Sequence, residues 1–242
     1  MARQEQAGEI INRTAVEVGL DRVSDPYSSA DAGFTQLTQL LNVAGQEMAE
    51  LRFWQELIYP ITIDTSTDLS GNRYELPTDF DRLIPQTGWD LSNDVPVMGP
   101  LSPQDWAYLK GRDLASSSIY IAYRQYRNDL EFYPETVPAA NLSFEYMTRN
   151  WAEDSVGVGI DFTTQTSDVV RLDPLLMQKF LKVKFLDAKN LPSDAARLDF
   201  DTVMENRFGF NNNAPVLSAS MSSRGFPYLN GFRNTPYTNF GM

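Results

Sequence analysis

Neither cysteine nor histidine occurs in this chain of 242 residues. The lack of cysteine excludes thiol nucleophiles, disulfides and thiolate metal sites, and the lack of histidine excludes every triad that uses imidazole as its base. A phosphate-binding P-loop and an EF-hand calcium loop are also missing. Carboxylates, lysines and tyrosines remain, but the commonest general acid–base is absent. We therefore expect a protein that is not an enzyme and holds no cofactor or metal.

Long apolar runs are lacking too. No stretch approaches the ~18–20 apolar residues that cross a bilayer. The first residues, MARQEQAGEIINRT, do not contain the apolar core of a signal peptide. These absences predict a protein that has no membrane segment and is made in a cytoplasm.

Basic residues are outnumbered, 20 against 32 acidic ones, which gives a net charge of −12. The simplest role of this acidity is solubility. It also argues against a protein that grips DNA, because phosphate binding needs clustered lysine and arginine.

The C-terminal segment lacks acidic residues and lysine altogether from Phe208 to Met242. Its charged side chains are Arg224 and Arg233, and its aromatic residues are Phe208, Phe210, Phe226, Tyr228, Phe232, Tyr237 and Phe240. Glycine and proline between these rings deny them a core of their own, while a solvated tail normally carries fewer aromatics. The pattern predicts an extended arm, residues 209–242, that becomes ordered on a partner; a tail wrapped over its own body is the alternative.

Helical spacing dominates the first 58 residues. One helix is expected over 4–18, ended by Gly19, and a longer one from Ser29 or Asp31 to residue 57, ended by Pro60. The apolar stripe of the long helix is Phe34, Leu37, Leu41, Ala44, Met48 and Leu51. Spacings of three and four predict a bundle core, with a dedicated site for a partner helix as the alternative.

Period-two patterns follow over 59–152. After Ile61 and Ile63, strands are expected at 73–76, 83–87, 95–98, 118–125, 129–133 and 141–150. Strand 118–125 is apolar on both faces, which indicates that it is covered on both sides or lies at a subunit contact. A short helix is expected to begin at Ser102-Pro103.

A polar connection over 153–172, predicted as a hairpin or loop, leads back to helices. Asp173 and Pro174 begin one, with Leu176, Phe180, Val183 and Leu186 on one face, and the last begins near Ser193 or Asp194 and fades by Phe208. The fold class expected is α+β: a helical bundle (1–58 and 173–208) with an inserted antiparallel β-domain (59–152), the connection 153–172 and the arm 209–242.

Three groups of side chains could have a functional role, and each group also has a simpler structural interpretation. Asp79 with Asp81, or Glu131 with Glu145, could form a catalytic acid–base pair, but the sequence gives no reason for them to converge. A sugar-stacking platform is the alternative to core packing for Trp89, Trp106, Trp151, Tyr120 and Tyr123. The last group is Lys179, Lys182, Lys184 and Lys189. These lysines are expected to lie on a solvated helix face, and the alternative is that they form a ring of positive charge facing a channel.

Four strings carry a resemblance to a known family. They are YELPTDFDRLI at 74–84, GW at 88–89, GPLSPQDW at 99–106 and FEYMTRNW at 144–151. In this order they resemble the head-to-tail adaptor proteins of tailed bacteriophages, the group that includes tail tubular protein A. The likeness extends to about residue 207 and stops short of the arm.

The resemblance implies a virion protein of the neck, between capsid and tail. It implies a ring, commonly of twelve copies, that binds the portal above and a tail or nozzle protein below, with double-stranded DNA passing through its lumen without specific binding. The residues expected to bind the portal are Arg224, Phe226, Tyr228, Phe232, Arg233, Tyr237 and Phe240. The alternatives are a carbohydrate-binding or surface-recognition β-module and a carboxylate hydrolase.

Overall fold

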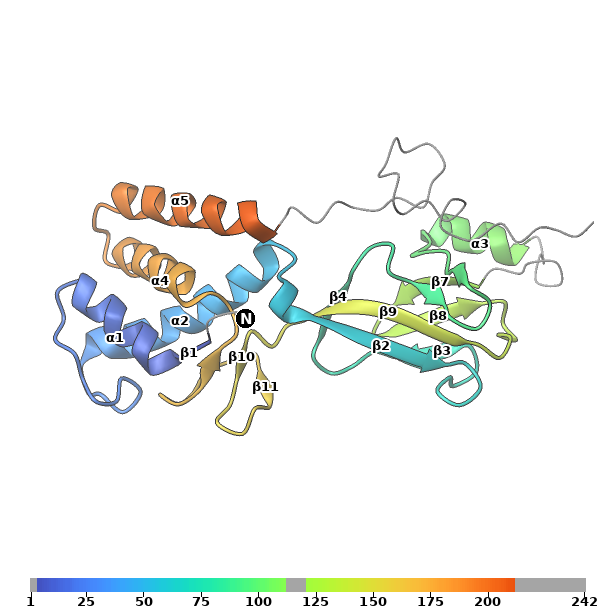
Figure 1. Ribbon diagram of the computed structural model, residues 1–242, viewed down its shortest axis with the longest axis horizontal. Coiled ribbons are helices and arrows are strands. Elements are labelled where there is room, and N and C mark those ends of the chain that lie inside the picture. Colours follow the sequence, from blue (N-terminus) through green and yellow to red (C-terminus); the bar gives the residue numbers. More distant parts are fainter. Residues whose placement is uncertain (1–3, 112–120, 212–242) are drawn as a thin grey trace, which may run out of the picture.

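The computed structural model describes residues 4–111 and 121–211 and arranges them in two lobes (Figure 1). The helical lobe holds the four long helices and a small sheet, and the β-lobe holds two further sheets and one short helix. In chain order, the strands of the β-lobe come between the second and third long helices. These strands pair in antiparallel fashion. The predicted α+β class with an inserted antiparallel β-domain is confirmed.

The helical lobe is built from α1 (Ala7–Glu17), α2 (Ala32–Leu51), α4 (Pro174–Ala188) and α5 (Asp194–Asn211). Helix α4 is central, because it packs against each of the other three. It therefore buries Met177, Leu181 and Phe185 in addition to the predicted Leu176, Phe180 and Val183, whereas Leu186 is only partly buried. The prediction of a single apolar face on this helix was too narrow.

The boundaries of α1 and the start of α2 follow the sequence signals. Gly19 takes a φ of 86° after α1, a conformation that favours glycine. Asp31 caps α2 by accepting a hydrogen bond from the Gly33 amide at 2.6 Å. The stripe from Phe34 to Met48 is buried as predicted, but Leu51 is 52% exposed.

The end of α2 differs from the prediction of residue 57. The chain becomes extended at Arg52, forms a single 3-10 turn at Gln55–Leu57 and enters strand β2 (Ile58–Asp64). Trp54 turns back, and its indole nitrogen donates to the Met48 carbonyl at 2.6 Å. Pro60 is not a helix terminator, because it lies within β2. Among the described strands β2 is an edge strand that pairs only with β9, and an edge position tolerates a residue without an amide hydrogen.

The region 153–172 is more ordered than the predicted loop. Strands β10 (Ala152–Glu153), β11 (Gly159–Ile160) and β12 (Val169–Val170) form a sheet with β1 (Glu5–Gln6) in the order β1-β12-β10-β11. Asn42 on α2 fixes this region to the helices, because its amide donates to the Thr163 carbonyl at 3.1 Å and accepts from the Thr163 amide at 2.7 Å. The predicted hairpin is present as β10–β11.

The β-lobe is a sandwich of two sheets. The first contains β2, β9 (Asn141–Thr148), β5 (Trp89–Asp90) and β6 (Val95–Pro96), with β4 (Phe80–Leu83) also paired to β9. The second has the order β3 (Arg73–Glu75), β8 (Asp129–Tyr133), β7 (Ala122–Tyr126), and α3 (Pro103–Gly111) packs on its outer side through Trp106. The core between the sheets includes Tyr123 and Phe144, whose ring centroids are 5.0 Å apart.

Most of the predicted strands are present with shifted ends. The strand expected at 83–87 lies at 80–83, and the others were placed within about three residues of the described ends. Of the strand expected at 118–125, residues 121–123 are buried, as predicted for a strand covered on both sides, and 118–120 lie outside the described residues.

Trp151 and Arg82 make two of the contacts that join the lobes. Trp151, just after β9, is fully buried in the helical core, where it faces Gly45 of α2 and donates to the Asp161 carbonyl at 2.8 Å. From β4, the Arg82 guanidinium lies 3.0, 3.1 and 3.3 Å from the carbonyl oxygens of Ala49, Glu50 and Arg52. Arg82 therefore caps the C-terminus of α2 from the β-lobe, where a cation also complements the helix dipole.

Candidate functional site

The predicted portal-binding residues lie outside the part of the chain that the structure describes. They are Arg224, Phe226, Tyr228, Phe232, Arg233, Tyr237 and Phe240. The helix before them, predicted to fade by Phe208, continues to Asn211. In Figure 1 this helix, α5, runs towards the junction between the lobes, so the arm begins there.

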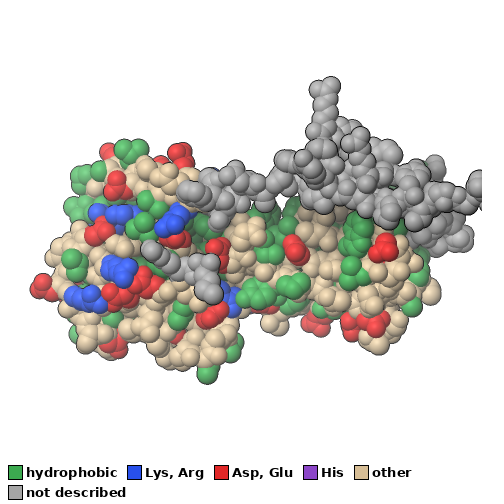
Figure 2. Space-filling model, in the orientation of Figure 1, with side chains coloured by type: hydrophobic (Ala, Val, Ile, Leu, Met, Phe, Trp, Pro, Cys, Tyr) green, Lys and Arg blue, Asp and Glu red, His purple; other side chains and the backbone are tan. Residues whose placement is uncertain are grey.

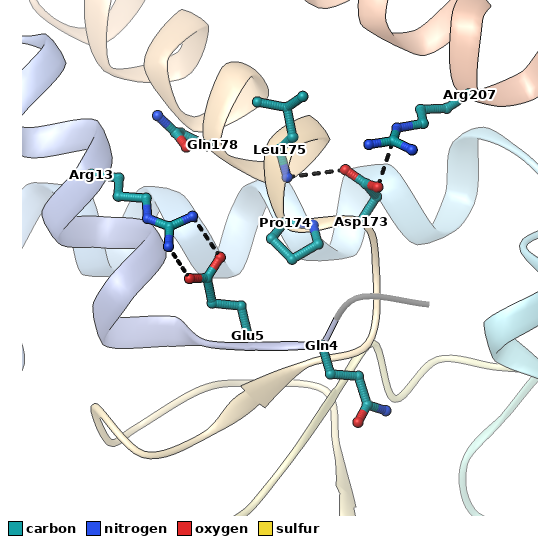
Figure 3. A pocket seen from close by; sticks show the side chains of 8 residues that line it. All are labelled: Gln4, Glu5, Arg13, Asp173, Pro174, Leu175, Gln178 and Arg207. Carbon is teal, nitrogen blue, oxygen red and sulfur yellow. Dashed lines mark hydrogen bonds and ion pairs between the residues drawn. The ribbon is translucent and has the colours of Figure 1, made fainter. Parts of the chain in front are cut away.

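A groove of about 390 Å³ lies beside the last turns of α5 (Figure 3). It is lined by Gln4, Glu5, Arg13, Asp173, Pro174, Leu175, Gln178 and Arg207. Two ion pairs bound it: Arg13 with Glu5 at 2.5 Å and Arg207 with Asp173 at 3.3 Å. Asp173 also caps α4 by accepting from the Leu175 and Leu176 amides at 3.0 and 3.1 Å. Each charge thus has a structural partner, and the groove links the start of α4 to the end of α5.

The lysines of α4 are engaged with acids of their own chain. Lys179 and Lys182 lie 3.4 and 2.8 Å from the Glu17 carboxylate, and Lys184 pairs with Glu47 on α2. Burial raises the pKa of Glu17, but the hydrogen bond and charge of Lys182 and the charge of Lys179 outweigh it and lower that pKa below 4.5. Lys189 instead lies 5.5 Å from the centroid of the Phe185 ring. These contacts fasten α4 to α1 and α2.

The carboxylates considered for catalysis have separate surroundings. Asp79 accepts hydrogen bonds from the hydroxyls of Tyr146 and Thr148, at 3.1 and 2.7 Å. Burial, reinforced by the Asp79 charge, raises the pKa of Tyr146 to about 12. Asp81 lies 3.4 Å from Arg82, and Glu145 is exposed on the outer side of β9. The structure does not bring these acids, or Glu131, together in one pocket among the described residues.

Core packing, the favoured interpretation of the aromatic residues, holds for three of the five, so the alternative of a sugar-stacking platform does not apply to them. Trp106, Tyr123 and Trp151 are buried, as the core interpretation predicted, and cannot stack on a ligand from solvent. Trp89 is 39% exposed, and Tyr120 lies outside the described residues.

Sequence reasoning missed a cluster of arginines on the outer side of the second sheet, which we call the arginine face. Strand register places Arg73 and Arg124 on either side of Glu131. The guanidinium carbons of Arg124, Arg73 and Arg127 lie 4.8, 5.3 and 5.4 Å from the centroid of the Tyr126 ring. The signal available in the sequence was the alternation of Ala122, Arg124 and Tyr126, which puts these side chains on one face.

Glu131 is the anion at the centre of this face. Its side chain is 5% exposed and accepts a hydrogen bond from Arg124 Nε at 2.7 Å. Burial raises the pKa of Glu131, but the hydrogen bond and charge of Arg124, with Arg73 and Lys110, outweigh it and lower that pKa below 4.5. The register also places Glu75 and Asp129 on this outer side, directly opposite one another, so the three arginines share the face with three carboxylates.

The outer side of the first sheet differs. We call it the Trp89 face: Pro60 and Thr62 of β2 pair with Glu145 and Ser143 of β9, and Trp89 of β5 pairs with Ser143. Figure 2 shows the β-lobe from the side of this sheet, with acidic and hydrophobic side chains but no Lys or Arg of the described residues beyond the lobe junction. The outer face of the first sheet therefore carries acidic and aromatic side chains, whereas that of the second carries basic, acidic and aromatic ones.

Further observations concern metals and membranes. Within residues 4–111 and 121–211, no three acidic side chains gather in a way that would hold a metal ion. None of the helices in this part of the chain has the length and hydropathy to span a bilayer.

A family model described as SU10 adaptor protein matches residues 6–209. The matched span begins in β1, covers both lobes and ends in the last turn of α5. A comparison with curated proteins gives no match. The predicted likeness to phage adaptors is thus supported over most of the chain, independently of the arm. The chain belongs to the SU10 adaptor protein family, and is a structural adaptor of bacteriophages.

Proposed function

We propose that this protein is a ring-forming head-to-tail adaptor in the neck of a tailed phage, with the portal above it and a tail or nozzle protein below. The observation that carries the proposal is the match of the adaptor family across both lobes. In this proposal about twelve copies form the ring, as in the related proteins that the sequence resembles. Double-stranded DNA passes through its lumen.

The charge of the molecule supports passage of DNA without binding. The net charge is −12, and all three lysines on α4 are already paired with Glu17 or Glu47. Nonspecific binding to DNA arises from cations that replace counterions on the phosphates. A surface with few unpaired lysines gives a lumen along which DNA slides.

The arm supplies the contact with the portal. It begins where α5 ends, at the junction of the lobes, and carries five aromatic side chains after residue 225. Burying each ring on a partner contributes about 1.5–3 kcal/mol, part of which is offset by the entropy lost when the arm becomes ordered. Arg224 and Arg233 are available for acidic groups of the portal.

Truncation after Asn211 tests the proposal. The truncated chain keeps every described helix and strand, so its circular dichroism and its Tm should match those of the full chain. It should no longer associate with the portal in sedimentation or electron microscopy. If the truncated chain binds the portal with the affinity of the full chain, the proposal is contradicted.

A substitution series separates the aromatic anchors from the length of the arm. Serine replaces each of the anchors Phe226, Tyr228, Phe232, Tyr237 and Phe240. Loss of even two buried rings should weaken portal binding by about a hundredfold or more. The matched control replaces five polar arm residues by alanine and should stay within about threefold of the unmodified chain; its positions are Ser218, Ser222, Asn230, Asn234 and Thr238.

A further inference from the structure

We propose that the groove beside the last turns of α5 holds the base of the arm, and that Val216 and Leu217 of the same chain fill it. These residues follow α5 closely and are distinct from the aromatic anchors of the arm. The inference goes beyond the proposed function, because it concerns a single copy of the chain and requires neither the ring nor the portal.

The groove lies where the arm begins. Arg207, which lines it, comes four residues before Asn211, the last residue of α5. At a rise of about 1.5 Å per residue, these four residues correspond to about 6 Å along the helix. The next five residues, 212–216, span at most about 17 Å when extended. The chain that leaves α5 is therefore long enough to turn and to reach the groove with Val216.

The sequence after α5 favours such a turn. Asn211 is followed by Asn212 and Asn213, and asparagine is one of the residues that adopt the left-handed conformation with which helices commonly end. Pro215 follows soon after, as proline often does beyond a helix. Val216 and Leu217 come next, and they are the only adjacent pair of branched aliphatic residues in 212–242. A chain reversal here directs this pair back towards the last turn of α5.

The groove suits an uncharged segment. Its four charged side chains form two ion pairs, which lie on either side of Pro174 in Figure 3. A charged group that entered would be partly desolvated without an unpaired partner in the lining, which costs free energy. Residues 208–223 carry no charged side chain, whereas residues 1–3, which precede the lining residue Gln4, include Arg3. The arm therefore fits the groove better than the N-terminal residues do.

The lining also offers apolar surface and hydrogen bonds to an extended segment. Leu175 is 41% exposed in the first turn of α4, so aliphatic side chains placed against it and Pro174 would remove apolar area from water. Gln178 donates to Glu17 at 2.6 Å, and its amide oxygen can accept from a backbone N–H. The groove can thus bind both the side chains and the backbone of the arm.

Docking at this point would determine where the rest of the arm leaves the body. Arg224, the first of the residues expected to bind the portal, follows Leu217 by seven residues. A short tether of this kind keeps the anchors at a high local concentration near the end of α5. In the proposed function, the docked pair would hold the arm in place before the portal is reached.

Cysteine cross-linking tests the placement, because the chain has no native cysteine. Full-length Gln178→Cys/Val216→Cys, treated at low protein concentration with a short bismaleimide, should form an intramolecular cross-link. The matched control is Thr202→Cys/Val216→Cys, in which the first cysteine is at an exposed position of α5, nine residues and about 14 Å before the helix end. The control should react at least tenfold more slowly, although the arm can reach both positions.

Amide hydrogen exchange on the cysteine-free, full-length chain supplies a second test. The amides of 216–218 should exchange at least tenfold more slowly than those of an unstructured chain. Val216→Ser/Leu217→Ser should abolish this protection, and so should Leu175→Gln, which changes an exposed side chain. Ser218→Ala/Ser220→Ala is the control and should keep it. The Tm should be unchanged in all of these variants, because a docked segment can leave the groove before the fold melts.

The possible outcomes distinguish this inference from its alternatives and from the proposed function. Cross-links between copies, detected in a mixture of ¹⁵N-labelled and unlabelled chains, would place a neighbour's arm in the groove and overturn the assignment to the same chain. Faster cross-linking in Ala2→Cys/Gln178→Cys than in the Val216 pair would assign the groove to the N-terminal residues. Equal rates for the test and control pairs, or unprotected amides at 216–218, would overturn the inference and leave the ring and the portal contact standing.

Discussion

Replacing Gly45 by alanine tests how tightly the lobes are joined. A β-carbon at this position would lie 2.2, 2.3 and 2.5 Å from three ring atoms of Trp151. Carbon atoms in contact are normally about 3.5–4.0 Å apart, so the indole must move by more than about 1 Å. Trp151 is fully buried and held by its hydrogen bond to Asp161, so little space exists for that movement.

The magnitude follows from two opposing effects. Overpacking of a core costs about 1–3 kcal/mol, and the upper end applies because the ring is held in place. Alanine in a helix interior regains about 1 kcal/mol relative to glycine. We therefore expect Gly45→Ala to lower the free energy of unfolding by about 2 kcal/mol, which for a chain of this size lowers Tm by about 4–8 °C.

Thermal unfolding by circular dichroism measures this effect. Gly111→Ala is the matched control, since among the described residues no atom outside its own helix backbone and chain neighbours lies within 4 Å of its added β-carbon, and its Tm should be unchanged within about 2 °C. In a Trp151→Phe background, Gly45→Ala should lose part of its effect, because the smaller phenyl ring lacks the five-membered ring and Cζ2 of the indole while it keeps a Cδ2. An unchanged or raised Tm for Gly45→Ala alone would refute the reasoning.

Two further predictions concern Arg82 and Glu131. Arg82→Ala should destabilise the protein by about 1–2 kcal/mol and speed amide hydrogen exchange in the last turn of α2, because three carbonyl groups lose their donor; unchanged exchange there would contradict the capping role. Glu131→Gln should destabilise the protein at neutral pH. Because the pKa of Glu131 is lower in the folded than in the unfolded state, its stabilisation is present above about 4.5 and lost as pH falls through the folded-state pKa. The difference in Tm between Glu131→Gln and the unmodified chain should therefore shrink in acid, and a constant difference would argue against the ion pair.

Local signals predicted the helical lobe well. The stripe on α2 and the caps Asp31 and Asp173 depend on residues within one or two helical turns, so the sequence shows them directly. The end of α2 could not be found in this way. It depends on Arg82, which follows thirty residues later and reaches the helix only through the pairing of β4 with β9.

The small sheet was missed for a related reason. Its strands have two residues each, which is too short for an alternating pattern to appear. Strand β1 also pairs with residues of β12 that lie far away in the chain. Only the polar residues of the region were visible in the sequence, and these indicated a hairpin or loop, of which the hairpin β10–β11 is present.

The arginine face shows the same limit at a candidate site. Arg73, Arg124 and Glu131 come from three strands, and their alignment depends on a register that no single strand reveals. The prediction that strand 118–125 is covered or at a subunit contact came nearest, because it concerned the same sheet. The arm, in contrast, was predicted from composition alone, and both its extended form and its role stay predictions, because residues 212–242 lie outside the described part of the chain.

The lobe junction sets how the two lobes are oriented. The arm, which binds the portal in the proposed function, begins at the end of α5 in the helical lobe, and the β-lobe lies on the other side of the junction. The orientation of one lobe relative to the other is held by Trp151, which is enclosed by α2, and by Arg82, which caps the same helix. A junction loosened by Gly45→Ala leaves the surface of each lobe intact but allows their relative orientation to vary. We therefore expect that variant to assemble on the portal less completely than its modest loss of stability alone would cause.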